Sequence, residues 1–332
     1  ESAVQRTGHG IQRAFILTMN QHLIAAREIE KATEAGFASK EEIPALEEPY
    51  LPNLVLAIEE PELYQHPSRQ RHMASVLLQL AQGSVPGVAK KTQVIYSTHA
   101  PLFVGLDRFD QIRVLRKENR EKGKPKITKV ARAELEAVAE EIWDARGRHG
   151  DKYTAETLKP RLQAIMTPWV NEGFFANVIV LVEGEDDRAA ILGMAKSMNY
   201  DFDSAGVAVV SCMGKNNIDR PLVIFRQLGI PVYVVWDSDH GDSNANPEAN
   251  RYLLRLVEQA ENDWPDAVED SYACFKTKLE TVLSREIGND LFNRTRSEVQ
   301  AQLGIPKKKD ALKNPTVLQQ VIDRAAAEGK VS

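Results

Sequence analysis

Two uninterrupted apolar stretches of this chain end in acidic residues. Val178–Asp187 reads Val-Ile-Val-Leu-Val-Glu-Gly-Glu-Asp-Asp, and Val232–Asp239 reads Val-Tyr-Val-Val-Trp-Asp-Ser-Asp. Continuous β-branched runs of this length are typical of strands that are covered on both faces of a parallel sheet. Sites in open α/β sheets form outside the carboxyl ends of the strands. We therefore expect the acidic residues of both stretches to meet in one crevice.

The spacing of these acids predicts where each one lies. Glu183 falls at a strand end, and Asp187 falls in the first turn of a helix predicted over 186–198. Asp237 and Asp239 would share one face if their strand persists, because side chains alternate along a strand. A solvated helix start favoured by the helix dipole is the alternative interpretation of the first cluster taken alone.

Four converging carboxylates would repel one another strongly unless cations neutralised them. Hard divalent ions such as Mg²⁺ or Mn²⁺ are the natural partners of oxygen ligands. The pattern therefore predicts a two-metal hydrolytic centre with its ions about 4 Å apart. Residues 237–248 also imitate a calcium loop, but Gly241 and Asp242 are in the wrong order and Pro247 interrupts it.

Two further elements extend this half of the chain. Val207–Ser211 predicts a third strand, and Asn217–Leu228 predicts an amphipathic helix that leads to the Asp237 strand. The loop between them contains Gly214 and Lys215, so Lys215 would approach a phosphate at the same sheet edge unless the loop is an ordinary connection. The order of elements predicts a doubly wound parallel sheet with right-handed crossovers.

The first half carries a second set of polar strand ends. Leu54–Ile58 predicts a buried strand that runs into Glu59 and Glu60, and Gln93–Ser97 predicts another that is followed by His99. A carboxylate pair at a parallel strand end suits Mg²⁺ binding and the polarisation of water beside a nucleotide phosphate. His99 is either a γ-phosphate contact or a structural hydrogen-bonding group.

A glycine-flanked turn, Gly8–Gln12, precedes both strands and would present free N–H groups to an anion or form a helix cap. Taken in order, the turn, the Glu59-Glu60 strand and the His99 strand resemble the signature loop, Walker B motif and switch histidine of an ABC-type ATPase. That resemblance implies that Gly10 and Gln12 belong to the signature loop. It also implies that Glu59 holds Mg²⁺ and Glu60 orients water.

The phosphate-binding loop G-x-x-x-x-G-K-[ST] is absent from the printed sequence. This chain alone is therefore not expected to hydrolyse ATP. The sequence starts at Glu1 rather than at Met, and we expect a preceding segment of a full-length protein to carry that loop.

A basic segment connects the two halves. Residues 113–132 are rich in Lys and Arg around Gly123, which predicts a hairpin that either tracks a DNA backbone or is simply solvated. The alternating strand Gln111–Lys117 closes the first lobe. Helical spacing in 133–145 and 154–166 predicts a small helical layer between two sheets.

Composition narrows the class of protein. The 332 residues are 43% hydrophobic and carry a formal charge of −5, so contact with nucleic acid requires a local basic patch. The two cysteines, Cys212 and Cys274, suit a reducing compartment and lack metal-type spacing. We expect a cytoplasmic protein without a membrane partner, because no apolar run reaches membrane length and no signal peptide opens the chain.

Glu183-Gly184 with Asp187, followed by Asp237-x-Asp239 after a second strand, looks like the Toprim metal-binding motif of topoisomerases, primases and OLD (overcoming lysogenization defect) nucleases. An ABC-like half followed by Toprim resembles the OLD family. The resemblance implies an α/β fold: a Rossmann-like parallel Toprim sheet flanked by helices, preceded by a partial ABC-ATPase-like lobe and a small helical connector. The expected domains are residues 1–117, 118–174 and 175–332.

Membership of that family would imply a metal-dependent DNA endonuclease of bacteria and their mobile elements. Two Mg²⁺ or Mn²⁺ ions would be held by Glu183, Asp187, Asp237 and Asp239, with Ser211 or Glu280 as auxiliaries. Ca²⁺ would bind without activity. OLD nucleases have a functional lysine near the end of this region, for which Lys313 is the candidate; Lys313 or Lys215 would offset charge on the phosphate.

The resemblance also implies DNA as a partner, and ATP and a homodimer through the ATPase region in the full-length protein. Two other classes remain open from the sequence. A topoisomerase or primase would share the acids but would need a strand-transfer tyrosine domain or a polymerising site. A non-catalytic DNA-associated assembly module would leave DNA intact in the presence of metal.

Overall fold

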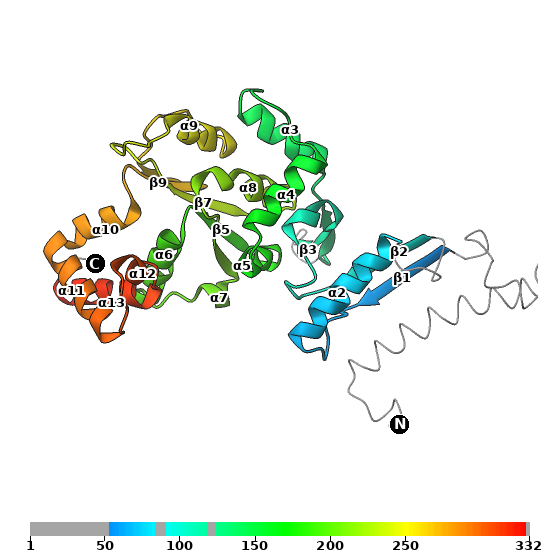
Figure 1. Ribbon diagram of the computed structural model, residues 1–332, viewed down its shortest axis with the longest axis horizontal. Helices are drawn as coiled ribbons and strands as arrows, with labels where there is room; N and C mark the ends of the chain where they lie inside the picture. Colours follow the sequence, from blue (N-terminus) through cyan, green and yellow to red (C-terminus); the bar gives the residue numbers. More distant parts are fainter. Residues whose placement is uncertain (1–52, 84–90, 119–123, 330–332) are drawn as a thin grey trace, which may run out of the picture. The chain divides into compact units, whose positions relative to one another are not determined.

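The computed structural model describes residues 53–83, 91–118 and 124–329 (Figure 1). They belong to two compact units, which divide between Phe103 and Val104. The signature-like residues Gly10 and Gln12 and the expected hairpin tip at Gly123 lie outside the described residues.

The first unit contains a two-stranded parallel sheet covered by one helix. Strand β1 (Asn53–Glu59) pairs with β2 (Lys91–Ser97), so that Glu59 is opposite Ser97. The residues that face inward alternate along both strands and pack against α2 (Pro67–Ala81). The two strands lie where the sequence predicts them, but the prediction of a buried strand over Leu54–Ile58 is wrong, because its residues alternate between exposed and half-buried.

The second unit begins at Val104, ahead of the expected connector over 118–174, and it includes the strand over 111–117 that the sequence analysis assigned to the first lobe. Strands β3 (Val114–Glu118) and β4 (Ile127–Ala131) form the expected antiparallel hairpin. Helices α3 (Leu135–Ala145) and α4 (Ala155–Ile165) follow, each with an apolar stripe buried in the main core. The 3-10 turn η4 (Leu106–Gln111) and the short helix α5 (Pro168–Glu172) also belong to this layer.

The main sheet has five strands in the order β6-β5-β7-β9-β8, of which the first four are parallel. Figure 1 labels β5, β7 and β9 of this sheet. Val182 is paired with Ser211 on one side and with Val235 on the other, so β5, β6 and β7 end close to the same level. Their acidic continuations therefore leave the sheet at one edge. The strands are β5 (Val178–Val182), β6 (Val207–Ser211), β7 (Val232–Asp237), β8 (Ala267–Val268) and β9 (Tyr272–Phe275).

Apolar residues cover both faces of this sheet, as the continuous apolar runs predict. One face packs with α3, α4 and the two helices α8 (Asp219–Gln227) and α9 (Pro247–Leu256). The other face packs with α6 (Glu185–Ser197) and α7 (Phe202–Ala205). The fold is thus the α/β arrangement with a mostly parallel sheet that the sequence predicts.

A group of C-terminal helices packs beside α6 (Figure 1). Gly193 lets α13 approach α6 closely, since a Cβ at this position would lie 2.9 Å from Leu318 Cβ. This contact fixes the helix whose first turn carries Asp187. The group comprises α10 (Leu279–Ile287), α11 (Asn289–Gln302), α12 (Lys308–Leu312) and α13 (Pro315–Ala327).

Every helix among the described residues is too short or too polar to cross a bilayer.

Candidate functional site

An acidic cleft of about 290 Å³ lies where β5 and β7 end and where α6 and α10 begin. The cleft brings together the four carboxylates that the sequence analysis selects, together with other acidic residues. Gly184, Asn244, Lys278 and Leu279 complete its wall. The acidic residues that line it are Glu183, Asp186, Asp187, Asp237, Asp239, Asp242 and Glu280.

The turn from β5 into α6 positions the first pair of acids. Gly184 is the N-cap residue of α6, and its N–H donates to Asp187 Oδ2 at 2.8 Å. This bond turns the Asp187 carboxylate back toward the strand end that Glu183 occupies. Within the described residues, the buried Glu183 Oε2 atom has no hydrogen-bond partner. A buried acceptor without a donor is costly, so this atom is available for a ligand.

The end of β7 positions the second pair. Asp237 is the last residue of the strand, and its Oδ1 accepts the Leu279 N–H at 3.1 Å from the first residue of α10. Asp239 has left the strand, because its φ is 59°. The strand does not persist to Asp239, so Asp237 and Asp239 do not share one strand face as the sequence analysis expected. Asp239 still lines the cleft. Its Oδ2 accepts a 2.6 Å hydrogen bond from Lys215 Nζ.

Burial and mutual repulsion make the charged forms of these acids costly. Burial raises the pKa of Asp237 to about 8, and the neighbouring Asp187 and Glu183 carboxylates add to the rise. Burial likewise raises the pKa of Asp187 to about 6, although the hydrogen bond from the Gly184 N–H stabilises the carboxylate and lowers this pKa. The pKa of Glu183 is raised by burial, which the Lys215 ammonium opposes. A cation in the cleft would relieve this repulsion.

The donor set fits a hard divalent ion. It consists of carboxylate oxygens, one of which, Glu183 Oε2, is buried without a donor. Mg²⁺ and Mn²⁺ prefer such ligands. In the part of the chain that the structure describes, no three Asp, Glu, His or Cys side chains already converge as a ready cage.

The auxiliary residues from the sequence analysis have different positions. Glu280 lines the cleft at the start of α10. Ser211 is buried at the end of β6, does not line the cleft, and its Oγ accepts the Met213 N–H at 3.4 Å. Lys313 Nζ lies 3.9 Å from Asp186 Oδ1, which places this lysine next to a lining acid.

Four polar residues that line the cleft were not among the predicted site residues: Asp186, Asp242, Asn244 and Lys278. Asp186 belongs to the acidic run after β5, next to the predicted ligand Asp187, so this run was the sequence feature that could have identified it. Asp242 and Asn244 belong to the loop after β7, and Lys278 is the N-cap residue of α10. Their positions depend on loop paths, for which the sequence offers no periodic pattern.

The first unit gathers its own predicted residues at the ends of β1 and β2. Glu59 ends β1, and Glu60 follows with a φ of 45°. His99 Nε2 lies 3.5 Å from Glu60 Oε1, while Glu62 accepts hydrogen bonds from Thr98 Oγ1 and the His99 N–H. Glu59-Glu60 and Ser97-Thr98-His99 therefore lie side by side at the ends of these two strands.

Without divalent metal, the chain should lose stability as the pH rises. The folded pKa values of Asp187 and Asp237, about 6 and about 8, exceed the ordinary aspartate value, so the folded chain keeps protons that the unfolded chain releases. Their contribution is fully present below about pH 4 and is lost as the pH rises through those two values.

Urea unfolding in EDTA, followed from acidic to mildly alkaline pH, measures this dependence. Each proton contributes a slope of up to about 1.4 kcal/mol per pH unit. The Asp237→Asn variant should lack the share of the slope that belongs to Asp237. A wild-type stability that stays level over this range, with the same profile in the variant, would contradict the assignment.

Comparisons with known proteins match both parts of the chain. A family model for the "Overcoming lysogenization defect protein-like, TOPRIM domain" matches residues 174–239, and a model for an "AAA ATPase domain" matches residues 1–104. The first range includes all four selected carboxylates. The second includes the Glu59-Glu60 and His99 motifs.

Two curated relatives are named as nucleases. The chain is 32% identical over 196 residues to the OLD nuclease of Thermus scotoductus, across 58% of this chain and 33% of that protein. It is 24% identical over 240 residues to the Old nuclease of Escherichia phage P2, across 71% of this chain and 33% of that protein. The chain thus spans about a third of the length of these relatives.

Solved structures of C-terminal regions of OLD proteins also match. The region from Burkholderia pseudomallei is 25% identical and aligns over 47% of this chain and 97% of that one, with a TM-score of 0.30. The region from Xanthomonas campestris pv. campestris is 17% identical and aligns over 47% of this chain and 99% of that one, also with a TM-score of 0.30.

Proposed function

Because the chain belongs to the OLD family, with an AAA ATPase region followed by an OLD-like Toprim domain, we propose that it is a metal-dependent DNA endonuclease. The observation that carries this proposal is the meeting of Glu183, Asp187, Asp237 and Asp239 in one cleft. The names of the two nuclease relatives support it.

Glu183, Asp187, Asp237 and Asp239 would hold two Mg²⁺ or Mn²⁺ ions, with Glu280 as a further ligand. When bound, such ions activate water and stabilise the leaving oxygen of a phosphodiester. The chain itself aims the ligands. Gly184 N–H orients Asp187, and Leu279 N–H orients Asp237, so each of these carboxylates keeps its other oxygen for an ion.

Positive side chains around the cleft would contact the DNA phosphates. Lys278 is exposed, lines the cleft and forms no ion pair with the described residues. Lys313, beside Asp186, would offset charge on the phosphate, whereas Lys215 reaches the site through Asp239. The cleft would therefore combine an acidic floor with lysines placed around it, as cleavage of a polyanion requires.

The first unit would couple this nuclease to ATP only in a protein that also carries the phosphate-binding loop. Glu59 would then hold the Mg²⁺ of the nucleotide, Glu60 would orient water and His99 would contact the γ-phosphate. We propose a homodimer through the ATPase region for the same full-length protein.

Digestion of supercoiled plasmid tests the proposed function. Nicked and linear products should form with Mg²⁺ or Mn²⁺ and should be absent with EDTA, while Ca²⁺ should bind without cleavage. A parallel preparation of Asp237→Asn controls for co-purified nuclease. A ladder of relaxed topoisomers would instead indicate a topoisomerase, and intact plasmid under every condition would indicate a binding module.

A further inference from the structure

Lys215 is a buried lysine at the edge of the acidic cleft. Its side chain is only 9% exposed, whereas lysines are rarely buried unless they are paired. The Gly214 N–H donates to the Glu183 carbonyl at 2.7 Å, which fixes the loop that carries Lys215 against the end of β5. The position of this lysine is therefore built into the fold.

The Lys215 ammonium has two partners. It donates to Asp239 Oδ2 at 2.6 Å and to Asn250 Oδ1 at 3.4 Å. Asp239 lines the cleft but Lys215 does not, so the ammonium meets this carboxylate from the protein side. A divalent ion in the cleft would meet the same carboxylate from the other side.

Asn250 holds the ammonium in place from helix α9. Its side chain is fully buried, and its Nδ2 donates to the carbonyl oxygens of Ser238 at 3.0 Å and Asp263 at 2.9 Å. Asn250 thus ties Lys215 to the strand end that carries Asp237 and Asp239. The orientation of the amide follows from these bonds, because only its oxygen can accept from the ammonium.

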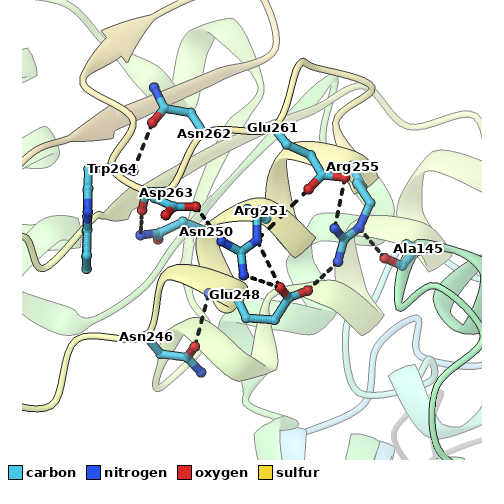
Figure 2. A network of polar contacts seen from close by, with 10 residues as sticks. All are labelled: Ala145, Asn246, Glu248, Asn250, Arg251, Arg255, Glu261, Asn262, Asp263 and Trp264. Carbon is cyan, nitrogen blue, oxygen red and sulfur yellow. Dashed lines mark hydrogen bonds and ion pairs between the residues drawn. The ribbon is translucent and has the colours of Figure 1, made fainter.

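A set of ion pairs keeps Asp263 within reach of Asn250 (Figure 2). Arg251 binds Glu248 through two nitrogens and also pairs with Asp263. Arg255 bridges Glu248 and Glu261, at 2.6 Å and 3.0 Å. These ion pairs hold the segment after α9 against that helix. Asp263 therefore keeps Asn250 in position, and Asn250 keeps the Lys215 ammonium beside Asp239.

We propose that the Lys215 ammonium is the built-in counter-cation of Asp239 and opposes divalent-ion binding in the cleft. The inference rests on the proposed function, because the divalent ions are part of that proposal. The ammonium and the ion share one carboxylate, and two cations near one anion repel each other. Lys215 would stabilise the metal-free fold and lower the affinity of the cleft for metal.

Titration calorimetry with Mn²⁺, without DNA, tests this inference on the whole chain. Lys215→Met should bind Mn²⁺ roughly tenfold or more tightly than the wild type, because a nearby charge is removed. Its melting temperature without metal should fall, and Mn²⁺ should raise it more than in the wild type. Lys276→Met, at an exposed lysine that does not line the cleft, should match the wild type.

The outcomes separate this inference from the proposed function. The proposed metal site itself fails if the wild type binds no Mn²⁺. It also fails if the wild type binds Mn²⁺ but Asp237→Asn leaves that binding unchanged. If the wild type binds and Lys215→Met binds equally or more weakly, the inference alone fails, because the lysine then orients Asp239 for the ion.

Lys215→Gln, which keeps a polar group for Asn250, provides the second variant. A variant that folds only with Mn²⁺ supports the exchange of ammonium for metal. Failure of both variants to fold, with or without Mn²⁺, overturns it.

Discussion

Asp237→Asn should lower the rate of DNA cleavage about a thousandfold, the equivalent of about 4 kcal/mol of transition-state stabilisation. The substitution replaces one carboxylate of the proposed ligand set by a neutral amide, which binds hard divalent ions less strongly. The amide oxygen still accepts the Leu279 N–H that Asp237 Oδ1 accepts at 3.1 Å. The loss therefore follows from metal binding rather than from a disturbed start of α10.

The same variant should be more stable than the wild type in EDTA at mildly alkaline pH, by roughly 1 kcal/mol or more. Burial and the adjacent carboxylates raise the pKa of Asp237 to about 8, so ionisation of this residue costs the folded chain free energy. Asparagine removes that cost. Lost activity with gained stability separates a functional acid from a structural one.

Plasmid cleavage and urea unfolding on the same preparation measure both halves of this prediction. Asp203→Asn, at an exposed acid away from the cleft, is the matched control and should leave both quantities unchanged. Cleavage at the wild-type rate by Asp237→Asn would remove Asp237 from the proposed ligand set. A clear loss of stability in Asp237→Asn would show that the metal-free fold stabilises the charged Asp237 carboxylate, contrary to this prediction.

The site acids could be predicted because strand periodicity and register place them. The apolar runs predict β5, β6 and β7 closely, since buried parallel strands must be apolar on both faces. Once Val182 pairs with both Ser211 and Val235, the residues after β5 and β7 leave the sheet side by side. Only Glu183 and Asp237 follow from this rule alone, and both line the cleft.

The remaining features depend on contacts between distant segments. Asp239 reaches the cleft through a left-handed turn rather than along the strand. Helix α9 ends at Leu256, and Glu258 beyond it adopts a φ of 59°. Arg251 and Arg255 of the helix bind acidic residues of the segment that follows (Figure 2). These ion pairs join helix α9 to the loop after it and depend on the path of that loop, so no local sequence pattern predicts them.

Asp219→Ala should destabilise the chain by about 3 to 5 kcal/mol, the cost of leaving a buried charge without its partner. The Asp219 side chain is 1% exposed and accepts hydrogen bonds of 3.0 Å from Arg146, Arg220 and the Tyr252 hydroxyl. Arg220 is itself 6% exposed, so water cannot replace the lost carboxylate. Helix α3 would also lose the Arg146 contact that joins it to α8.

Urea unfolding measures this loss, and Glu140→Ala provides the comparison. Glu140 accepts from Arg148 at 3.2 Å and from Lys152, but all three side chains are at least 31% exposed, so its removal should cost about 0 to 1 kcal/mol. A similar small cost for Asp219→Ala would mean that Arg220 finds another anion or water. Arg220 also donates to the Asn216 carbonyl and to Asn217 Oδ1, in the loop that carries Lys215. The loss of Asp219 should therefore also change the Mn²⁺ affinity of the cleft. Arg220, which binds this loop, would lose the carboxylate that fixes its guanidinium.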